Sequence, residues 1–351
     1  MPDLRNLARL KVKRPSGALR QMTHSLPNLW HSFGTNMLAL VRPRTSSNPL
    51  DRITEVAAFG SNPGGLRMHL YTPPRIPAPG APLIVVLHGC KQDGPAFAEH
   101  SGWLDLARRL GIPLLIPQQI AENNPARCFN WFRPTDTARG GGEAMSIRQM
   151  ISLATRRFGT DRRRVFVVGL SAGGAMAVAM LAAYPAVFAA GAVVAGMPVG
   201  SARNAAGAIL RMRHAGLYLH RESLAARVRA ATPARGRQPW PRLSIWQGSA
   251  DQTVDPANAE TLVAQWTALH GLDAEPGTDA EPSPGLRHRR WGTAQRPGQR
   301  PAVEAWTIEG AGHGFPVAAE VTGGGQAAPW VLDLGVPAAR RIAEFWGLEA
   351  G

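Results

Sequence analysis

The sequence predicts an α/β fold in which helices flank a mainly parallel sheet and an antiparallel hairpin comes first. Two observations support this fold class. Apolar runs of strand length, such as residues 83–87 and 165–170, alternate along the chain with segments of helical length. Residues 83–87 are apolar throughout, which is typical of a strand buried on both faces. Strands that alternate with helices are joined by right-handed crossovers, so most of them should run parallel.

The hairpin is predicted from residues 53–59 and 66–71, which flank the turn-forming segment Ser61-Asn-Pro-Gly-Gly65. A proline-rich linker follows at residues 73–82. After it, strands are predicted at residues 83–87, 113–116, 165–170, 189–194, 243–247 and 303–308. Helices are predicted at residues 97–110, 143–158, 172–184, 257–270 and 337–346.

Two segments interrupt this alternation. Residues 203–241 are rich in Ala and Arg, with a helix predicted at 220–229, and we treat them as a candidate lid or cap. Residues 271–300 are rich in Pro, Gly and charge, with one strand predicted at 287–291. Because α/β domains often exceed the average domain size, we expect residues 51–351 to form a single domain.

The positive charge is concentrated at the N-terminus. The formal net charge is +15, and residues 1–50 contain eight basic side chains against one acidic side chain. We expect residues 1–50 to form a basic, loosely packed arm. The chain has no recognisable RNA- or DNA-binding motif, so we expect no nucleic-acid partner. No apolar run has the length of a membrane span, so we expect no stable membrane insertion.

A nucleophilic serine is predicted within Gly169-Leu-Ser-Ala-Gly173. A predicted strand ends just before Ser171 and a predicted helix begins just after it. Small residues on both sides of the serine relieve crowding in such a sharp turn. A Gly-x-Ser-x-Gly match alone could arise by chance in a Gly- and Ala-rich chain. The flanking strand and helix favour the α/β-hydrolase fold, with Ser171 as the nucleophile.

Two backbone N–H groups are candidates for an oxyanion hole. Ala172 begins the helix after Ser171, so its N–H points toward the developing negative charge. Cys90 follows an early strand, at the position where hydrolases supply a second donor. His88 precedes Cys90, and we keep two interpretations of it: a group that fixes the loop, or a weaker candidate for a substrate-cleft residue.

The acid of a catalytic triad should follow the serine along the chain and precede the histidine. Asp251 and Asp255 both follow the strand predicted at 243–247. Asp255 stands before Pro256 and a helix, so we interpret it as a helix N-cap. No such structural role explains Asp251. We therefore predict that Asp251 orients the catalytic imidazole.

Three histidines follow Asp251: His270, His288 and His313. His270 is predicted at a helix C-terminus, where an imidazole suits the helix dipole. His288 lies in a basic, polar segment. His313 lies between glycines directly after the strand predicted at 303–308, where a loop can return the ring to the serine. We predict that His313 is the general base.

With these residues placed, the chain resembles the polyhydroxybutyrate (PHB) depolymerase-type esterases, a group that includes feruloyl esterase-like enzymes. The resemblance extends from about residue 53 to residue 346. It rests on Leu87-His-Gly-Cys-Lys-Gln92, Arg127-Cys-Phe-Asn-Trp-Phe132, Gly169-Leu-Ser-Ala-Gly-Gly174, Gln247-Gly-Ser-Ala-Asp251 and Gly312-His313. It implies a triad of Ser171, Asp251 and His313, with Cys90 at the oxyanion position. It also implies an ester substrate and no metal or organic cofactor.

The Cys128 block raises two further questions. Cys128 and Cys90 could form a disulfide that fixes the oxyanion loop, or both could be reduced and buried, and the sequence leaves the two equally open. Trp131 and Phe132 are candidates for lining the substrate cleft, although aromatic residues are more often part of ordinary packing.

Three departures from the family affect the expected substrate and location. The resemblance implies an extracellular enzyme, yet no apolar segment of signal-peptide length follows the basic N-terminus, so a cytoplasmic location is the alternative. The chain ends soon after its last predicted helix, which disfavours a crystalline polymer as substrate. Gly314-Phe-Pro316 also differs from the family's usual residues after the histidine, so the acyl pocket is expected to differ.

The sequence predicts a serine ester hydrolase that acts on short-chain or hydroxyalkanoate esters through an acyl-Ser171 intermediate. The alternatives are a feruloyl or acetyl esterase that acts on plant-derived or sugar esters, and an acyltransferase with the same triad. A non-catalytic binding protein of the same fold is disfavoured, because the residues of a complete triad and an oxyanion element are all present.

Overall fold

The computed structural model describes residues 49–75, 77–216, 220–231, 239–292 and 300–348. The chain divides into two units, Met1–Thr45 and Ser46–Gly351, and the description that follows concerns the second. The predicted arm at residues 1–50 lies almost entirely outside the described residues.

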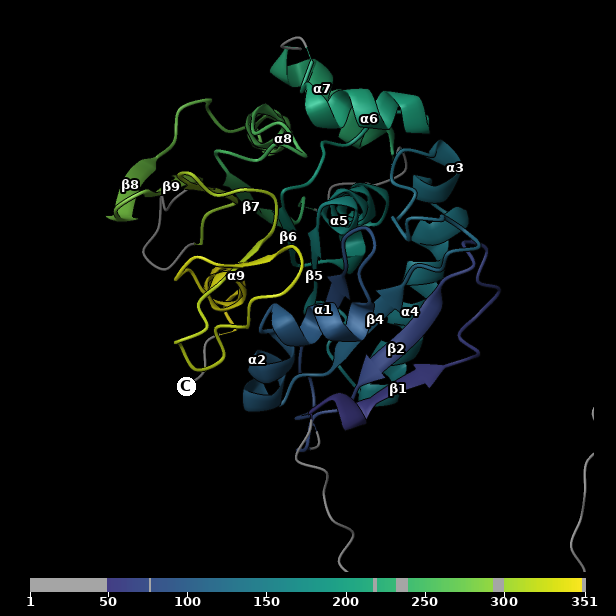
Figure 1. The fold of residues 1–351 in the computed structure, drawn as a ribbon. Coiled ribbons are helices and arrows are strands. Elements are labelled where there is room, and N and C mark those ends of the chain that lie inside the picture. The colour runs from purple at the N-terminus through teal and green to yellow at the C-terminus, as the bar shows by residue number, and fades with distance from the viewer. Residues whose placement is uncertain (1–48, 76, 217–219, 232–238, 293–299, 349–351) are drawn as a thin grey trace, which may run out of the picture. The chain divides into compact units, whose positions relative to one another are not determined.

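A ten-stranded sheet forms the centre of the described unit (Figure 1). Its strand order is β1-β2-β4-β3-β5-β6-β7-β10-β9-β8, and the neighbours from β4 to β10 all pair in parallel. The strands are β1 (Ile53–Val56), β2 (Arg67–Tyr71), β3 (Leu83–Leu87), β4 (Leu114–Gln118), β5 (Val165–Leu170), β6 (Ala190–Val194), β7 (Arg242–Gly248), β8 (Thr278–Ser283), β9 (Leu286–Trp291) and β10 (Val303–Ile308). The mainly parallel sheet and its opening antiparallel hairpin, β1 with β2, are confirmed.

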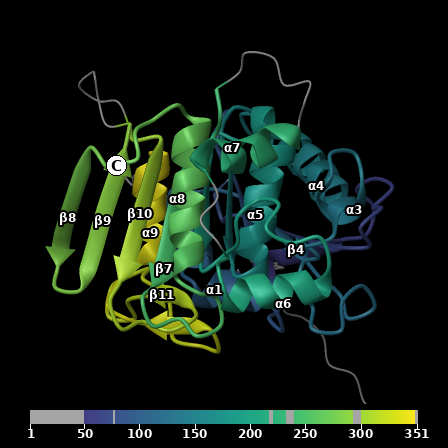
Figure 2. The same ribbon diagram turned by 90° about the horizontal axis from the view of Figure 1, so that it is seen from above.

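Helices cover both faces of this sheet (Figures 1 and 2). One layer contains α1 (Gly94–His100), α2 (Trp103–Leu110) and α9 (Ala338–Trp346). The other layer contains α4 (Gly142–Phe158), α5 (Ala172–Ala183) and α8 (Ala257–Leu269). The short helix α3 (Pro134–Thr137) precedes α4, and α7 (Arg221–Ala230) packs on α8.

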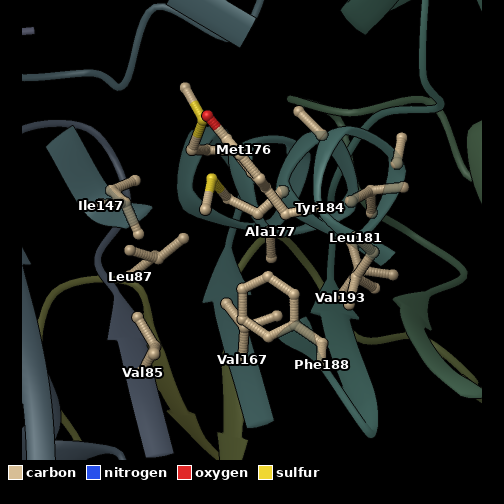
Figure 3. Close-up of a cluster of buried hydrophobic side chains, with 14 of the residues drawn as sticks. Val85, Leu87, Ile147, Val167, Met176, Ala177, Leu181, Tyr184, Phe188 and Val193 are labelled. Atoms are coloured by element: carbon tan, nitrogen blue, oxygen red, sulfur yellow. The ribbon is translucent and has the colours of Figure 1, made fainter. Parts of the chain in front are cut away.

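Alternating strand residues supply the cores of the two layers. In β3, Val85 and Leu87 face the α5 layer, whereas Ile84 and Val86 face the α9 layer. Figure 3 shows the α5 side, where α5 lies over the parallel strands and its side chains meet those of Val85, Leu87, Ile147, Val167 and Val193. Every residue of α5 is buried. This packing fixes the start of α5, which directly follows the predicted nucleophile.

The fold differs from the sequence-based expectation in several places, one of which is the unexpected strand β8 within residues 271–300. The helix predicted at residues 97–110 is two helices, because Gly102 takes a φ of 83° between α1 and α2. A Cβ at Gly102 would lie 2.9 Å from the Gly323 carbonyl oxygen, so a close backbone contact accompanies the break. Residues 203–241 contain α6 (Ala205–Arg213) in addition to the expected α7.

Candidate active site

The parallel strands bring four of the predicted site residues to one edge of the sheet. Parallel strands have their carboxyl ends at the same edge, and loops at that edge form the binding sites of such folds. His88 follows β3, Ser171 follows β5, Asp251 lies three residues after β7, and His313 lies five residues after β10. The fold therefore gathers residues that are far apart in the sequence.

Ser171 sits in a sharp, strained turn between β5 and α5. Its φ of 56° and ψ of −118° lie outside the regions that a non-glycine residue normally occupies. A Cβ at Gly169 would lie 2.2 Å from the Gly173 carbonyl oxygen, and a Cβ at Gly173 would lie 2.4 Å from the Leu87 carbonyl oxygen. Gly169 is therefore required for the turn to close, and Gly173 for the start of α5 to approach β3. Backbone strain of this kind is typical of functional positions.

The two candidate oxyanion donors have no acceptor in the described part of the chain. Ala172 is the first residue of α5, so its N–H has no partner within the helix. Within the same described residues, the Cys90 N–H also donates no hydrogen bond. By contrast, the neighbouring N–H of Ser171 donates to the Val194 carbonyl at 2.8 Å. Two N–H groups thus remain available beside the serine.

Asp251 and His313 form a hydrogen-bonded pair. The His313 Nδ1 and the Asp251 Oδ2 lie 2.8 Å apart, and the Asp251 side chain is fully buried. The other carboxylate oxygen of Asp251 accepts hydrogen bonds from the backbone N–H groups of Thr253 at 2.8 Å and Val254 at 2.9 Å. Gln247 Nε2 donates to Oδ2 at 2.9 Å. Four donors therefore hold this carboxylate in one orientation.

The surroundings of Asp251 favour its charged form. Burial alone would raise the pKa of the carboxyl. The hydrogen bond and the charge interaction with His313, together with the two backbone N–H donors, outweigh burial and bring the pKa below its ordinary value. An ionised carboxylate at this position stabilises an imidazolium ring on His313.

A glycine-rich loop brings His313 to this acid. The Ala250 N–H donates to the Ala311 carbonyl at 3.0 Å, and the Gly310 N–H donates to Ser249 Oγ at 2.9 Å. Among the described residues, no hydrogen bond joins His313 to the Ser171 hydroxyl. Catalytic hydrogen bonds are often long without substrate and shorten once it binds.

A disulfide and several hydrogen bonds fix the loop that carries Cys90. The Cys90 and Cys128 sulfurs are bonded, with their Cα atoms 4.2 Å apart. The Lys91 N–H donates to the Ala126 carbonyl at 2.7 Å, and Gln92 Oε1 accepts from the Gly89 N–H at 2.7 Å. The loop is thus fastened both to its neighbouring segment and to itself.

His88 fixes this loop and does not face a cleft. Its ring is fully buried, with Nδ1 2.7 Å from the Gly89 carbonyl oxygen and Nε2 accepting the Gln119 N–H at 3.1 Å. Burial lowers the pKa of His88 to about 4, although the hydrogen bond to Gly89 opposes this shift. The ring is therefore neutral near pH 7. This geometry matches the first of the two interpretations, a loop-fixing residue.

Glu143, at the start of α4, is a buried acid that sequence reasoning missed. Its oxygens accept hydrogen bonds from Gln119 Nε2 at 2.6 Å, from Asn130 Nδ2 at 2.7 Å and from the Asn130 N–H at 2.9 Å. Gln119 Nε2 also donates to the Cys128 carbonyl at 3.1 Å. In the sequence, Glu143 is an acidic residue in the first turn of a predicted helix, which is a common arrangement. No local pattern could therefore have identified its buried hydrogen bonds to Gln119 and Asn130.

Trp131 lies beside an apolar cluster next to Ser171. The partly exposed Trp131 packs against a cluster that contains Ala175, which follows the serine by one helical turn, and Val254, which follows Asp251 by three residues. Met197 and the partly buried Met212 of α6 complete this cluster. Phe132 lies behind Trp131, with the two rings edge to face at 5.7 Å. A small apolar cluster therefore includes a residue of α5 that follows the serine by one helical turn.

The rejected triad candidates have structural partners. Asp255 accepts a hydrogen bond at 3.0 Å from the first-turn N–H of α8, although the N-cap itself is the next residue, Pro256, and not Asp255 as expected. His270 ends α8. His288, on β9, lies 2.8 Å from a carboxylate oxygen of Glu304. None of these contacts involves Ser171.

The described residues lack two kinds of feature. No group of three or more His, Cys, Asp or Glu side chains there is arranged to hold a metal ion. No helix in the same residues is long and apolar enough to cross a bilayer.

Comparison with known proteins identifies the family. Residues 66–282 match the family model described as Esterase PHB depolymerase. The chain is 39% identical to poly(3-hydroxyalkanoate) depolymerase C of Paucimonas lemoignei over 306 residues, which cover 86% of this chain and 72% of the relative. It is 31% identical to feruloyl esterase B of Talaromyces stipitatus over 75% of this chain and 72% of the relative.

A solved structure agrees on the fold. The acetyl xylan esterase from Aspergillus awamori superimposes with a TM-score of 0.69 at 23% identity and covers 85% of this chain and 99% of its own. The fold is the α/β-hydrolase fold that the sequence predicts. From the family match and the identity to its curated relatives, the chain belongs to the PHB depolymerase family of esterases and is a serine-type carboxylic ester hydrolase.

Proposed function

We propose that the chain cleaves short-chain or hydroxyalkanoate esters through an acyl-Ser171 intermediate, and that residues 51–351 are its catalytic domain. The observation that carries this proposal is the 2.8 Å contact between Asp251 and His313 at the sheet edge where the strained Ser171 lies. His313 takes the Ser171 proton as the hydroxyl attacks, and later returns a proton to the leaving alcohol. Water then releases the acyl group by the same proton transfers in the second half of the reaction.

The N–H groups of Cys90 and Ala172 are proposed to hold the oxyanion. Their lack of an acceptor in the described chain supports this role, because such donors act best when they are fixed before the charge develops. Trp131 and its apolar cluster are proposed to contact the acyl group, with α6 as the cap that closes this side. The proposed reaction uses side chains and backbone groups alone.

The hydroxyalkanoate substrate is proposed from the 39% identity to a poly(3-hydroxyalkanoate) depolymerase. A feruloyl or acetyl ester of plant origin is the second candidate, supported by the 31% identity to a feruloyl esterase. Product analysis separates the two. Chromatography of 3-hydroxybutyrate oligomers, methyl ferulate and acetylated xylose after incubation should show cleavage of the oligomers first, whereas faster release of ferulate or acetate would reverse the assignment.

The nucleophile is tested with p-nitrophenyl acetate and butyrate. Ser171→Ala should lower kcat about 10⁶-fold and abolish labelling by a fluorophosphonate probe. Ser201→Ala, which changes a serine after β6 at the same sheet edge, should keep both activity and labelling. If wild type and Ser171→Ala released nitrophenol equally, the proposed function would be rejected.

A further inference from the structure

Trp330 occupies a strained and exposed position. Its φ is 59° and 40% of its surface is exposed. The Val331 N–H donates to the Ala328 carbonyl at 2.8 Å and the Ala328 N–H donates to the Val331 carbonyl at 3.1 Å, so Pro329 and Trp330 form the tip of a tight turn. With Pro second and a positive φ third, this is a type II turn, whose third position favours Gly or Asn. A large aromatic residue is therefore unfavourable at this position.

Packing does not explain this tryptophan. A ring that stabilised the core would be buried, as Trp103, Trp246 and Trp266 are in the same unit. Trp330 instead combines backbone strain with a solvent-exposed apolar ring. Residues that keep an unfavourable backbone conformation are concentrated at sites of function, where the surrounding structure holds them in place.

The turn is fastened to both loops of the proposed machinery. The Trp330 carbonyl accepts a hydrogen bond at 2.9 Å from the N–H of Phe315, two residues after His313. The Pro329 carbonyl accepts one at 3.1 Å from Nε2 of Gln92, two residues after Cys90. The backbone of the turn that carries the indole is thus bonded to the His313 loop and to the Cys90 loop at once.

The proton transfer in the reaction indicates which part of the ester Trp330 can contact. His313 must donate a proton to the oxygen of the leaving alcohol, so the alcohol lies on the His313 side of Ser171. The apolar cluster around Trp131, which includes Ala175 of α5, is proposed above to contact the acyl group. A group anchored to the His313 loop is therefore placed to contact the alcohol portion.

We propose that Trp330 binds the leaving alcohol of the ester by packing its indole against an apolar or planar face of that group. This inference rests on the proposed function. In a hydroxyalkanoate oligomer the leaving alcohol is the rest of the chain, which presents alkyl groups to the ring. Trp330 then selects esters by their alcohol, whereas the Trp131 cluster selects them by their acyl group.

The test compares benzyl acetate, ethyl acetate and ethyl butyrate, because the first two differ in the alcohol and the last two in the acyl group. Trp330→Gly should lower kcat/KM for benzyl acetate about tenfold and change both ethyl esters little and equally. Trp330→Phe should retain most of the activity on benzyl acetate. Val321→Ala shortens another exposed apolar side chain, in the segment between His313 and Trp330. It should leave kcat/KM for all three esters unchanged.

Thermal unfolding tests whether a loss of activity comes from a less stable protein. Glycine suits a positive φ, so Trp330→Gly should melt at or above the wild-type temperature. Equal losses on all three esters, or losses that follow the acyl chain, would overturn the inference. If wild type hydrolysed none of the esters faster than Ser171→Ala, the proposed function would fail and this inference with it. A failure of the inference alone would leave wild-type hydrolysis intact, so the two failures are distinguishable.

Discussion

The two loops that carry the proposed machinery are held in very different ways. The loop after β3, with Cys90, is fixed by a disulfide to Cys128 and by side chains that bond its own backbone. The loop after β10, with His313, is rich in glycine and depends on one carboxylate and a few backbone contacts. Both loops lie at the same edge of one sheet.

The difference follows from what each loop has to do. An N–H donor lowers the energy of an oxyanion only if it is already aimed at the charge, so the backbone that carries it must be rigid. An imidazole that accepts and returns a proton needs a defined tautomer and direction, which a single carboxylate supplies. We therefore expect changes to the first loop to affect stability and rate together, and changes to the second to affect mainly rate.

Among the variants that test this comparison, Asp251→Asn should have the largest effect. The new amide can donate to His313 Nδ1 and select the wrong tautomer, while its carbonyl oxygen still accepts the Thr253 and Val254 N–H groups. We expect kcat on p-nitrophenyl butyrate to fall about 10⁴-fold, with little change in KM and a lower Tm, because Gln247 Nε2 loses its acceptor. Asp255→Asn is the matched control and should stay within a few-fold of wild type. Similar losses in the two variants would contradict the choice of Asp251 as the acid.

A smaller effect on rate, with a clear effect on stability, is expected when both Cys90 and Cys128 are changed to Ser. The disulfide spans 38 positions, and opening a loop of this length should lower the free energy of unfolding by about 4 kcal/mol. We expect kcat to fall about tenfold, because one displaced oxyanion donor costs up to about 10²–10³. Urea unfolding measures the free energy of unfolding, and initial rates measure kcat. Wild type treated with reductant should behave like the double variant. A double variant with unchanged kcat would show that the hydrogen bonds alone fix the loop.

The sequence was most informative where burial dictates composition. The strands β3 and β5 have the bounds that their apolar runs predicted. A central parallel strand must be apolar on both faces, so its length can be read from the residues themselves. The pairing of Asp251 with His313 was also predicted, because the order of the triad residues and the ends of the strands restrict the choice.

The sequence was uninformative where a contact between distant segments decides the structure. Gly102 divides one predicted helix at a point where the backbone of Gly323 lies close to it. Glu143 reaches Gln119 and Asn130, and neither contact has a local signature. Trp330 stands at a turn position that favours glycine, so local preference argues against its observed conformation. Such residues depend on tertiary contacts that no single segment specifies.

Among these variants the smallest effect is expected at Glu143, which is hydrogen-bonded to Gln119 and Asn130 in the segment that carries Cys128. Burial raises the pKa of Glu143 from 4.5 to about 7, although hydrogen bonds from Asn130 and Gln119 oppose this shift. The folded protein thus retains a proton that the unfolded chain has lost, so this contribution to stability is present at low pH and is lost as the pH rises toward 7. The advantage of wild type over Glu143→Gln in unfolding free energy should be larger at pH 5 than at pH 8, by on the order of 2 kcal/mol. Urea unfolding at the two pH values measures it, with the exposed Glu344→Gln as the control that should follow wild type. An unchanged difference would show that Glu143 is ionised throughout and holds the loop as a carboxylate.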